Sequence, residues 1–190
     1  MLKLITSTVL ISAATLVIAD HTFVLHNQCN YRVNPKIVNV NCGYSPRCDV
    51  PGSGGVPNPA VSYTGPQPRT LGVNGDNTNM TVNRDWNGRI FHQTGKCGAK
   101  GESCTMAEFN LDTGGPWSQQ SYDISNIQGF TMGMKIEVND GVGPAVTCSN
   151  IYCGCLNAYP PGTDFSGCGN DWPVKGTSGG DKIWTVTFCA

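Results

Sequence analysis

The chain has 190 residues, a length that favours one domain, and only 13% of them are charged. Its 12 basic and 13 acidic residues leave a formal net charge of −1. A chain without a basic excess does not attract nucleic acid or an anionic membrane surface, so we expect neither as a partner. We also expect no stable membrane insertion, because no segment after residue 19 is long and apolar enough to span a bilayer.

Residues 1–19 have the pattern of a secretory signal peptide. Lys3 supplies the positive start, residues 9–18 form a short apolar core, and Ala19 completes a small-residue cleavage site. The apolar run is too short for a membrane anchor. We therefore expect a secreted, extracellular protein whose mature domain is residues 20–190.

All ten cysteines lie in the mature part. An even number behind a signal peptide predicts five disulfides, and we expect no metal or other cofactor. The alternative to a protein without metal is a copper site. Cleavage after Asp20 would leave His21 at the N-terminus, where it could hold copper together with His26. The short loop between Cys42 and Cys48 predicts that these two are bonded. The cysteines are Cys29, Cys42, Cys48, Cys97, Cys104, Cys148, Cys153, Cys155, Cys168 and Cys189.

Short runs of alternating apolar and polar residues predict an all-β protein, a flattened antiparallel β-sandwich with Greek-key-like connections. We expect residues 81–83 to pair beside the strand 88–94. Residues 50–68 are rich in Pro, Gly and Ser and predict a surface loop. Residues 148–172 predict a small disulfide-stapled loop lobe. The other expected strands are residues 22–25, 37–40, 107–111, 122–127, 130–134, 135–138 and 182–189.

Two carboxylates fall in neighbouring predicted strands. Glu108 lies in the strand 107–111, and Asp123 lies near the start of the strand 122–127. Antiparallel pairing would place both side chains on one face of the sheet. Hydrolysis of a glycosidic bond requires such a pair, whereas two solvated acids on a sheet surface are the simpler interpretation.

Several motifs resemble the signature of thaumatin-like proteins. They are GRIFHQTGKC at 88–97, AEFNL at 107–111 and SYDISNIQGF at 121–130, with similar matches in the first and last strands. The resemblance covers nearly the whole mature chain and is closest to the small type, which has fewer cysteines and a reduced second lobe. It implies the thaumatin-like sandwich and the disulfides Cys29–Cys189 and Cys97–Cys104. In the lobe it implies Cys148–Cys168 with Cys153–Cys155, and Cys148–Cys155 with Cys153–Cys168 is the alternative.

The resemblance also implies a cleft lined by one arginine, one glutamate and three aspartates. Arg69 matches the arginine, Glu108 the glutamate and Asp123 the first aspartate. Gln128 stands where the family has its second aspartate, and Asp164 is a loose match to the last. The cleft is therefore expected to be less acidic than in the antifungal members.

Chemical roles follow from these matches. Glu108 would be the general acid, Asp123 the nucleophile or base, and Arg69 would orient one carboxylate through a bidentate pair. Phe109 or Phe130 would help to bury Glu108 and raise its pKa. Tyr122, Trp117 and Trp86 are candidates for stacking on sugar faces, in competition with packing in the core.

The expected protein is a monomeric, pathogenesis-related protein of defence or wall remodelling that binds β-1,3-glucan or another cell-wall polysaccharide. The alternatives are a weak endo-β-1,3-glucanase using Glu108 and Asp123, and an inhibitor of a secreted hydrolase acting through residues 50–68. Binding is favoured because Gln128 and the short lobe predict a shallow cleft, which harms hydrolysis more than adhesion. The sequon at Asn79 predicts an exposed, N-glycosylated position.

Overall fold

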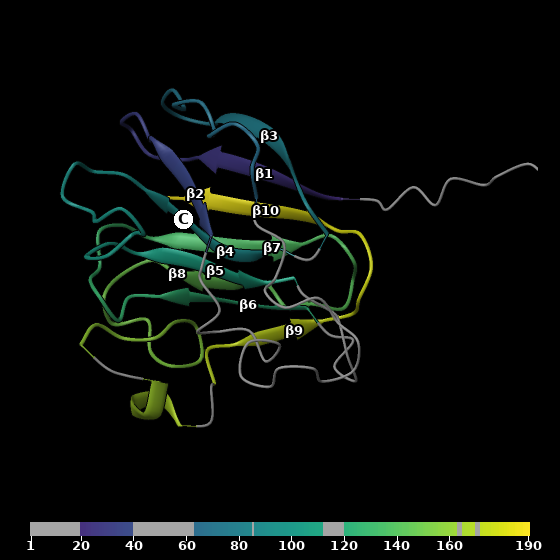
Figure 1. Ribbon diagram of the computed structural model, residues 1–190. Helices are drawn as coiled ribbons and strands as arrows, with labels where there is room; N and C mark the ends of the chain where they lie inside the picture. The colour runs from purple at the N-terminus through teal and green to yellow at the C-terminus, as the bar shows by residue number, and fades with distance from the viewer. Residues whose placement is uncertain (1–19, 40–62, 85, 112–119, 163–164, 170–171) are drawn as a thin grey trace, which may run out of the picture.

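The structure is a computed structural model that describes residues 20–39, 63–84, 86–111, 120–162, 165–169 and 172–190. The predicted signal peptide, the Cys42–Cys48 loop, Trp117 and Asp164 lie outside the described residues. Two five-stranded sheets pack face to face (Figure 1), which confirms the all-β sandwich. The described residues contain one 3₁₀ turn, η1 (Phe165–Cys168), and no helix long and apolar enough to cross a membrane.

The first sheet brings the two ends of the mature chain together. β1 runs parallel to β10, while the other neighbours in this sheet are antiparallel. The disulfide Cys29–Cys189 follows directly after these two strands and joins them, as the resemblance implied. In spatial order the sheet contains β3 (Asp76–Val82), β1 (His21–Asn27), β10 (Ile183–Phe188), β7 (Met134–Val138) and β8 (Val146–Cys148).

The second sheet is antiparallel throughout. In spatial order it contains β2 (Pro35–Asn39), β4 (Asn87–His92), β5 (Met106–Asn110), β6 (Gln120–Ser125) and β9 (Lys175–Thr177). The predicted pairing of residues 81–83 beside the strand 88–94 is wrong. Thr81 and Val82 end β3 and pair with β1, and a turn closed by Trp86 N–H and Asn83 O (3.1 Å) then carries the chain into the second sheet.

Aromatic side chains from both sheets meet in the core. Phe23 packs edge-on against Phe109, with ring centroids 5.0 Å apart, and Tyr122 packs edge-on against Trp184 at the same distance. Burying each such side chain contributes roughly 1.5–3 kcal/mol. Tyr122 is 1% exposed and Trp86 is fully buried. The expectation that these two rings stack on sugar is therefore wrong, because the alternation of β6 and the turn before β4 point them inward.

The pairing predicted for the four lobe cysteines is also wrong in both versions. The structure joins Cys148 to Cys153 and Cys155 to Cys168. A turn closed by Cys153 N–H and Asn150 O (3.2 Å) brings Cys153 back beside the end of β8. Gly154 then adopts a φ of 73° and redirects the chain. Neighbouring cysteines on either side of this glycine are thereby sent to different partners. The pair Cys97–Cys104 forms as the resemblance implied.

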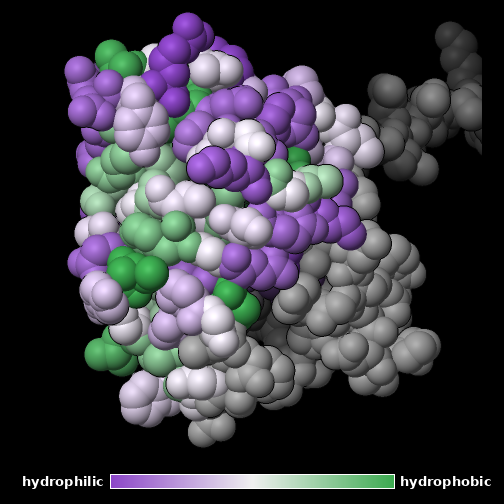
Figure 2. Space-filling view, turned by 90° about the vertical axis from the view of Figure 1, so that its left-hand side faces the viewer, coloured by the Kyte–Doolittle hydropathy of each residue, from purple (hydrophilic) through white to green (hydrophobic). Residues whose placement is uncertain are grey.

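Figure 2 shows the face that is turned to the left in Figure 1. Hydrophobic residues gather over its middle and lower part, whereas hydrophilic residues prevail at its top and right. Among the described residues, half of the large hydrophobic side chains that remain exposed belong to the lobe at 148–172. These are Ile151, Tyr152, Leu156 and Trp172.

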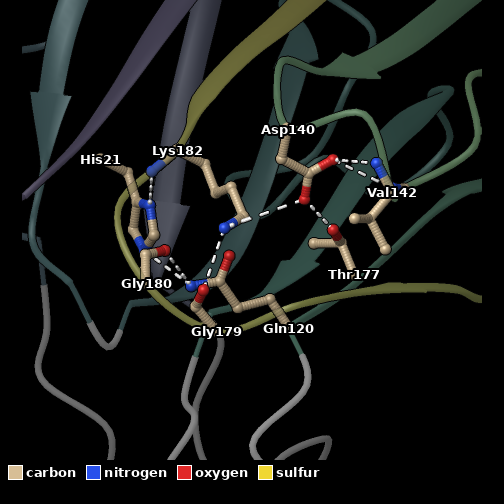
Figure 3. Close-up of polar contacts among 9 residues, drawn as sticks. His21, Gln120, Asp140, Val142, Thr177, Gly179, Gly180 and Lys182 are labelled. Carbon is tan, nitrogen blue, oxygen red and sulfur yellow. Dashed lines mark hydrogen bonds and ion pairs between the residues drawn. The ribbon is translucent and has the colours of Figure 1, made fainter.

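A buried polar cluster joins the two sheets at the edge where β1 begins (Figure 3). The His21 side chain is fully buried; its Nδ1 accepts a hydrogen bond from Lys182 N–H (3.1 Å) and its Nε2 lies 3.0 Å from Arg84 O. Because Nδ1 accepts, the proton of the neutral ring is on Nε2. Both ring nitrogens are thus occupied, which gives no support to a copper site at His21. Burial lowers the pKa of His21, although the bond to Arg84 and the charge of Asp181 oppose this.

The same cluster contains a charged pair. Lys182 Nζ lies 3.8 Å from Asp140 Oδ2, and both side chains are less than a tenth exposed. Asp140 also accepts hydrogen bonds from the Thr177 hydroxyl and from two backbone N–H groups of the turn that follows β7. Gln120, at the start of β6, donates to Gly180 O (2.9 Å). Hydrogen bonds from several loops therefore compensate for the burial of these charges.

Candidate functional site

The two predicted carboxylates are direct neighbours across two strands. In the register of the second sheet, Glu108 of β5 stands opposite Asp123 of β6, and Arg89 of β4 stands opposite Glu108. Residues opposite one another in antiparallel strands share a face of the sheet. The prediction that Glu108 and Asp123 lie side by side on one face is confirmed. We call Arg89, Glu108 and Asp123 the carboxylate row.

The row lies on the face of the sheet that is turned away from the core. The neighbours of its members along the strands, Ala107, Phe109, Tyr122 and Ile124, all belong to the buried core. Side chains alternate between the two faces of a strand, so the charged residues point to the opposite side. The period-two pattern visible in the sequence thus determines the direction of both carboxylates.

Arg89 is the nearest partner of Glu108. Its Nε donates a hydrogen bond to Glu108 Oε1 at 2.5 Å, and the two side chains are 8% and 19% exposed. Removing one member of such a buried pair typically costs about 3–5 kcal/mol, because the other charge is left without compensation. Sequence reasoning missed Arg89. The sequence could have indicated Arg89, because the Cys97–Cys104 loop connects its strand directly to β5, and two strands joined in this way usually pair.

Arg69 does not take the position that the resemblance gave it. Its guanidinium forms a bidentate pair with Asp76, with both N–O distances at 2.7 Å, and also donates to Asn77 O. Asp76 begins β3 in the other sheet. The turn between Leu71 and Asp76 folds the chain back, so that Arg69 faces Asp76. This guanidinium and the Gly72 N–H hold the pKa of Asp76 well below its usual range. Orientation of a carboxylate in the row by Arg69 is therefore a wrong prediction.

Lys175 is the basic residue on the strand next to Asp123, but it is not in register with the row. It lies on the neighbouring strand β9, opposite Tyr122. Burial lowers the pKa of Lys175, and the charge of Asp123 opposes that effect. Asp123 itself is only 9% exposed. Arg89 therefore lies beside Glu108 within the row, whereas Lys175 acts on Asp123 through its charge from the neighbouring strand.

The segment after β6 contains the remaining predicted cleft residues. Asn126 to Gly129 form a turn closed by Gly129 N–H and Asn126 O (2.9 Å), and Gln128 is exposed on it. Phe130 is half-buried and packs against the core. Gln128 is therefore available to a ligand, while Phe130 presents only part of its ring. Asn79 is exposed on β3, as the sequon predicted.

The lobe contacts the end of β6 in space. Ser125 forms a parallel bridge with Tyr159, and Tyr159 N–H donates to Ile124 O at 3.0 Å. Tyr159 of the segment 148–162 therefore lies beside the residues that follow Asp123. Within the described ranges, no group of three or more histidine, cysteine or acidic residues is placed to hold a metal ion. The chemistry that the row offers is that of carboxylate acceptors and cationic donors for hydroxyl groups.

Comparison with known proteins supports the family resemblance. The chain is 29% identical over 174 residues to thaumatin-like pathogenesis-related protein 3 of Avena sativa, a match that covers 88% of this chain and 86% of the relative. Thaumatin-like pathogenesis-related protein 2 of the same species is 28% identical over the same shares. No protein-family model matches the chain.

A solved structure supports the fold. The protein elicitor MoHrip2 from Magnaporthe oryzae superposes with a TM-score of 0.54 and 15% sequence identity. The match covers 90% of this chain and 99% of the elicitor. At this identity the likeness concerns the sandwich alone.

Proposed function

We propose that this chain, which is similar in sequence to thaumatin-like pathogenesis-related proteins, is a secreted defence protein that binds β-1,3-glucan or a similar neutral cell-wall polysaccharide. The observation that carries the proposal is the pairing of Glu108 with Asp123 on one face of the second sheet, with Arg89 opposite Glu108 on the same face. Carboxylates accept hydrogen bonds from sugar hydroxyls, and the basic residues can donate to them. The charge of Lys175 acts on Asp123 from the neighbouring strand, and together with it the charges of the row sum to zero, which suits a neutral ligand.

The contact between Arg89 and Glu108 favours binding over hydrolysis. A general acid has to donate a proton to the leaving oxygen, and its carboxyl must be available for this. Here Glu108 accepts a charge-assisted hydrogen bond from Arg89 Nε at 2.5 Å. This bond orients the carboxylate as an acceptor, a role that serves recognition rather than acid catalysis.

Endo-β-1,3-glucanase activity is the second candidate, and the register favours it. Residues directly opposite in antiparallel strands have Cβ atoms about 4.5–5.5 Å apart. Retaining glycosidases hold their two carboxyl groups about 5–5.5 Å apart, and inverting enzymes hold them farther apart. If Glu108 and Asp123 are catalytic, their place directly opposite one another is compatible with a retaining enzyme, and the orientation of the two side chains sets the separation of the carboxyl groups.

One experiment separates these two candidates. The secreted protein is incubated with insoluble β-1,3-glucan, and the sedimented protein and the released reducing sugar are measured for wild type, Glu108→Gln and Asp123→Asn. Glu137→Gln, a change of an exposed carboxylate on β7, serves as the control. We expect sedimentation of the wild type and the control, weaker sedimentation of the two row variants, and no released sugar.

Sugar released by the wild type and lost in Glu108→Gln would establish the glucanase instead. Neither sedimentation nor release by the wild type would overturn the glucan proposal. Inhibition of a secreted hydrolase stays a prediction, since most of residues 50–68 lies outside the described residues.

We also propose removal of residues 1–19, a monomeric mature protein and a glycan on Asn79. The mass of the secreted protein before and after enzymatic deglycosylation tests the cleavage site and the glycan, and size-exclusion chromatography tests the monomer.

A further inference from the structure

The tip of the lobe exposes large side chains that the fold does not need for its core. We define this tip as residues 149–157. Tyr152 is 90% exposed, Leu156 67% and Ile151 41%. Exposed apolar side chains that occur singly need no explanation, but three within six consecutive residues, one of them an aromatic ring, indicate a contact surface.

The tip is held in one conformation although it is exposed. The disulfides Cys148–Cys153 and Cys155–Cys168 fix it at both sides. Tyr152 N–H donates to Asn150 Oδ1 (2.8 Å), and Asn157 Nδ2 donates to Cys153 O (3.0 Å). A surface that is ordered before binding loses little conformational entropy when a ligand arrives.

The chemistry of the tip selects among possible partners. The segment 148–162 contains no acidic residue, no basic residue and no histidine. It therefore has no charge with which to hold an anionic lipid, a nucleic acid or a charged protein surface. The tip presents an aromatic ring together with the exposed, uncharged polar residues Ser149 and Asn150. A ring beside amide and hydroxyl groups matches a neutral sugar, which has an apolar face and an edge of hydroxyls.

The position of the tip adds to this argument. The lobe is bonded to the end of β6 through Tyr159, whose N–H and C=O bond to Ile124 and Asn126. Asp123 is the residue directly before Ile124. A polymer bound at the carboxylate row therefore has a short path to the lobe, whereas a single sugar bound at the row would leave the tip uncovered.

We propose that the lobe tip is a second contact surface for a neutral polysaccharide, with Tyr152 stacking on a sugar ring and Leu156 packing beside it. The inference rests on the proposed function, because it takes the same polymer as the ligand. It goes beyond that function by assigning part of the binding to a surface without carboxylates.

The test compares the sedimentation of four variants with insoluble β-1,3-glucan and with cellulose. Tyr152→Ala is expected to bind about five- to tenfold more weakly than wild type, as loss of an aromatic contact would predict, while Tyr152→Phe keeps the ring and binds as wild type. Leu156→Ala is expected to bind more weakly than Val142→Ala. Val142 is a matched control because it is 65% exposed but lies on the turn after β7. Unchanged thermal unfolding of all four variants shows that they are folded.

The possible outcomes distinguish this inference from the proposed function. If wild type binds and Tyr152→Ala binds equally well, the lobe surface is overturned and the carboxylate row stands. If Tyr152→Ala weakens binding while Glu108→Gln does not, the lobe surface is supported and the row is overturned. Wild type that binds neither polymer overturns both. Sedimentation of wild type, but not of Tyr152→Ala, with phosphatidylcholine vesicles would assign the tip to a membrane and overturn the polysaccharide.

Discussion

Removing the disulfide Cys29–Cys189 should destabilise the protein more than removing Cys97–Cys104. Each bond restricts the unfolded chain, and the effect grows with the logarithm of the loop that it closes. The sequence separations are 160 and 7 residues. The chain-entropy relation then predicts losses of about 5 and about 2 kcal/mol, a difference of about 3 kcal/mol. Other disulfides inside the long loop reduce its effective length. The predicted stabilisation changes little as a result, because it depends on the logarithm of that length.

The assay is urea unfolding of two double variants, Cys29→Ala with Cys189→Ala and Cys97→Ala with Cys104→Ala. The free energy of unfolding is obtained by linear extrapolation, and a change in slope would show that the denatured state has expanded. The comparison is well matched, since each bond has one fully or almost fully buried cysteine, Cys29 at 2% and Cys104 at 0% exposure. Equal losses, or a larger loss for the short loop, would refute the argument from loop length.

Three further predictions concern single side chains. Burial lowers the pKa of His21 in the folded protein, so the unfolded chain binds the proton more tightly. The free energy of unfolding should therefore fall as the pH decreases from about 6.5 towards the lowered pKa. A free energy of unfolding that stays constant over this range would contradict the prediction. Asp76→Asn should lower the thermal unfolding temperature at neutral pH, and the difference from wild type should disappear in strong acid, because protonation then removes the partner of Arg69 in wild type as well. Tyr122→Phe should cost about 1 kcal/mol of unfolding free energy, since the buried Tyr122 side chain donates its hydroxyl to Pro144 O. Burial and the charge of Asp140 raise the pKa of Tyr122 to about 12, so an ultraviolet titration of wild type should contain one late tyrosine that the variant lacks.

Several strands of the sandwich were predictable because they carry their own alternation, but the strand expected at 130–134 is wrong, since only Met134 of that run belongs to a strand, β7. Residues 107–111 and 122–127 were expected as half-buried neighbours, and β5 and β6 occupy almost the same residues in the predicted antiparallel pairing. The two strands are consecutive in the described sequence of elements, and consecutive strands usually pair. Residues 81–83 were expected to pair beside the strand 88–94, but Thr81 and Val82 pair with β1 in the other sheet. Alternation reports which face is buried and does not report which sheet the strand joins.

The candidate site was predictable to the same extent. Glu108 and Asp123 are local to one hairpin, and their shared face follows from period two and the register. Arg69 was assigned by motif alone, and the structure pairs it with Asp76, whereas Arg89 meets Glu108. Tyr122 and Trp86 were candidate sugar contacts because sequence does not distinguish an exposed aromatic ring from a buried one.

The amino-acid sequence by itself determined the all-β class and the direction of both carboxylates, and its resemblance to a known family implied the disulfides Cys29–Cys189 and Cys97–Cys104. These features depend on local periodicity, on one hairpin and on motifs at the chain ends. Only the tertiary structure decided which arginine pairs with Glu108 and how the four lobe cysteines are joined. Those contacts depend on how turns such as Leu71–Asp76 and Gly154 redirect the chain in space, and many partners at similar sequence distances satisfy the same local pattern. The closing of turns, and not the residue types alone, selects among them.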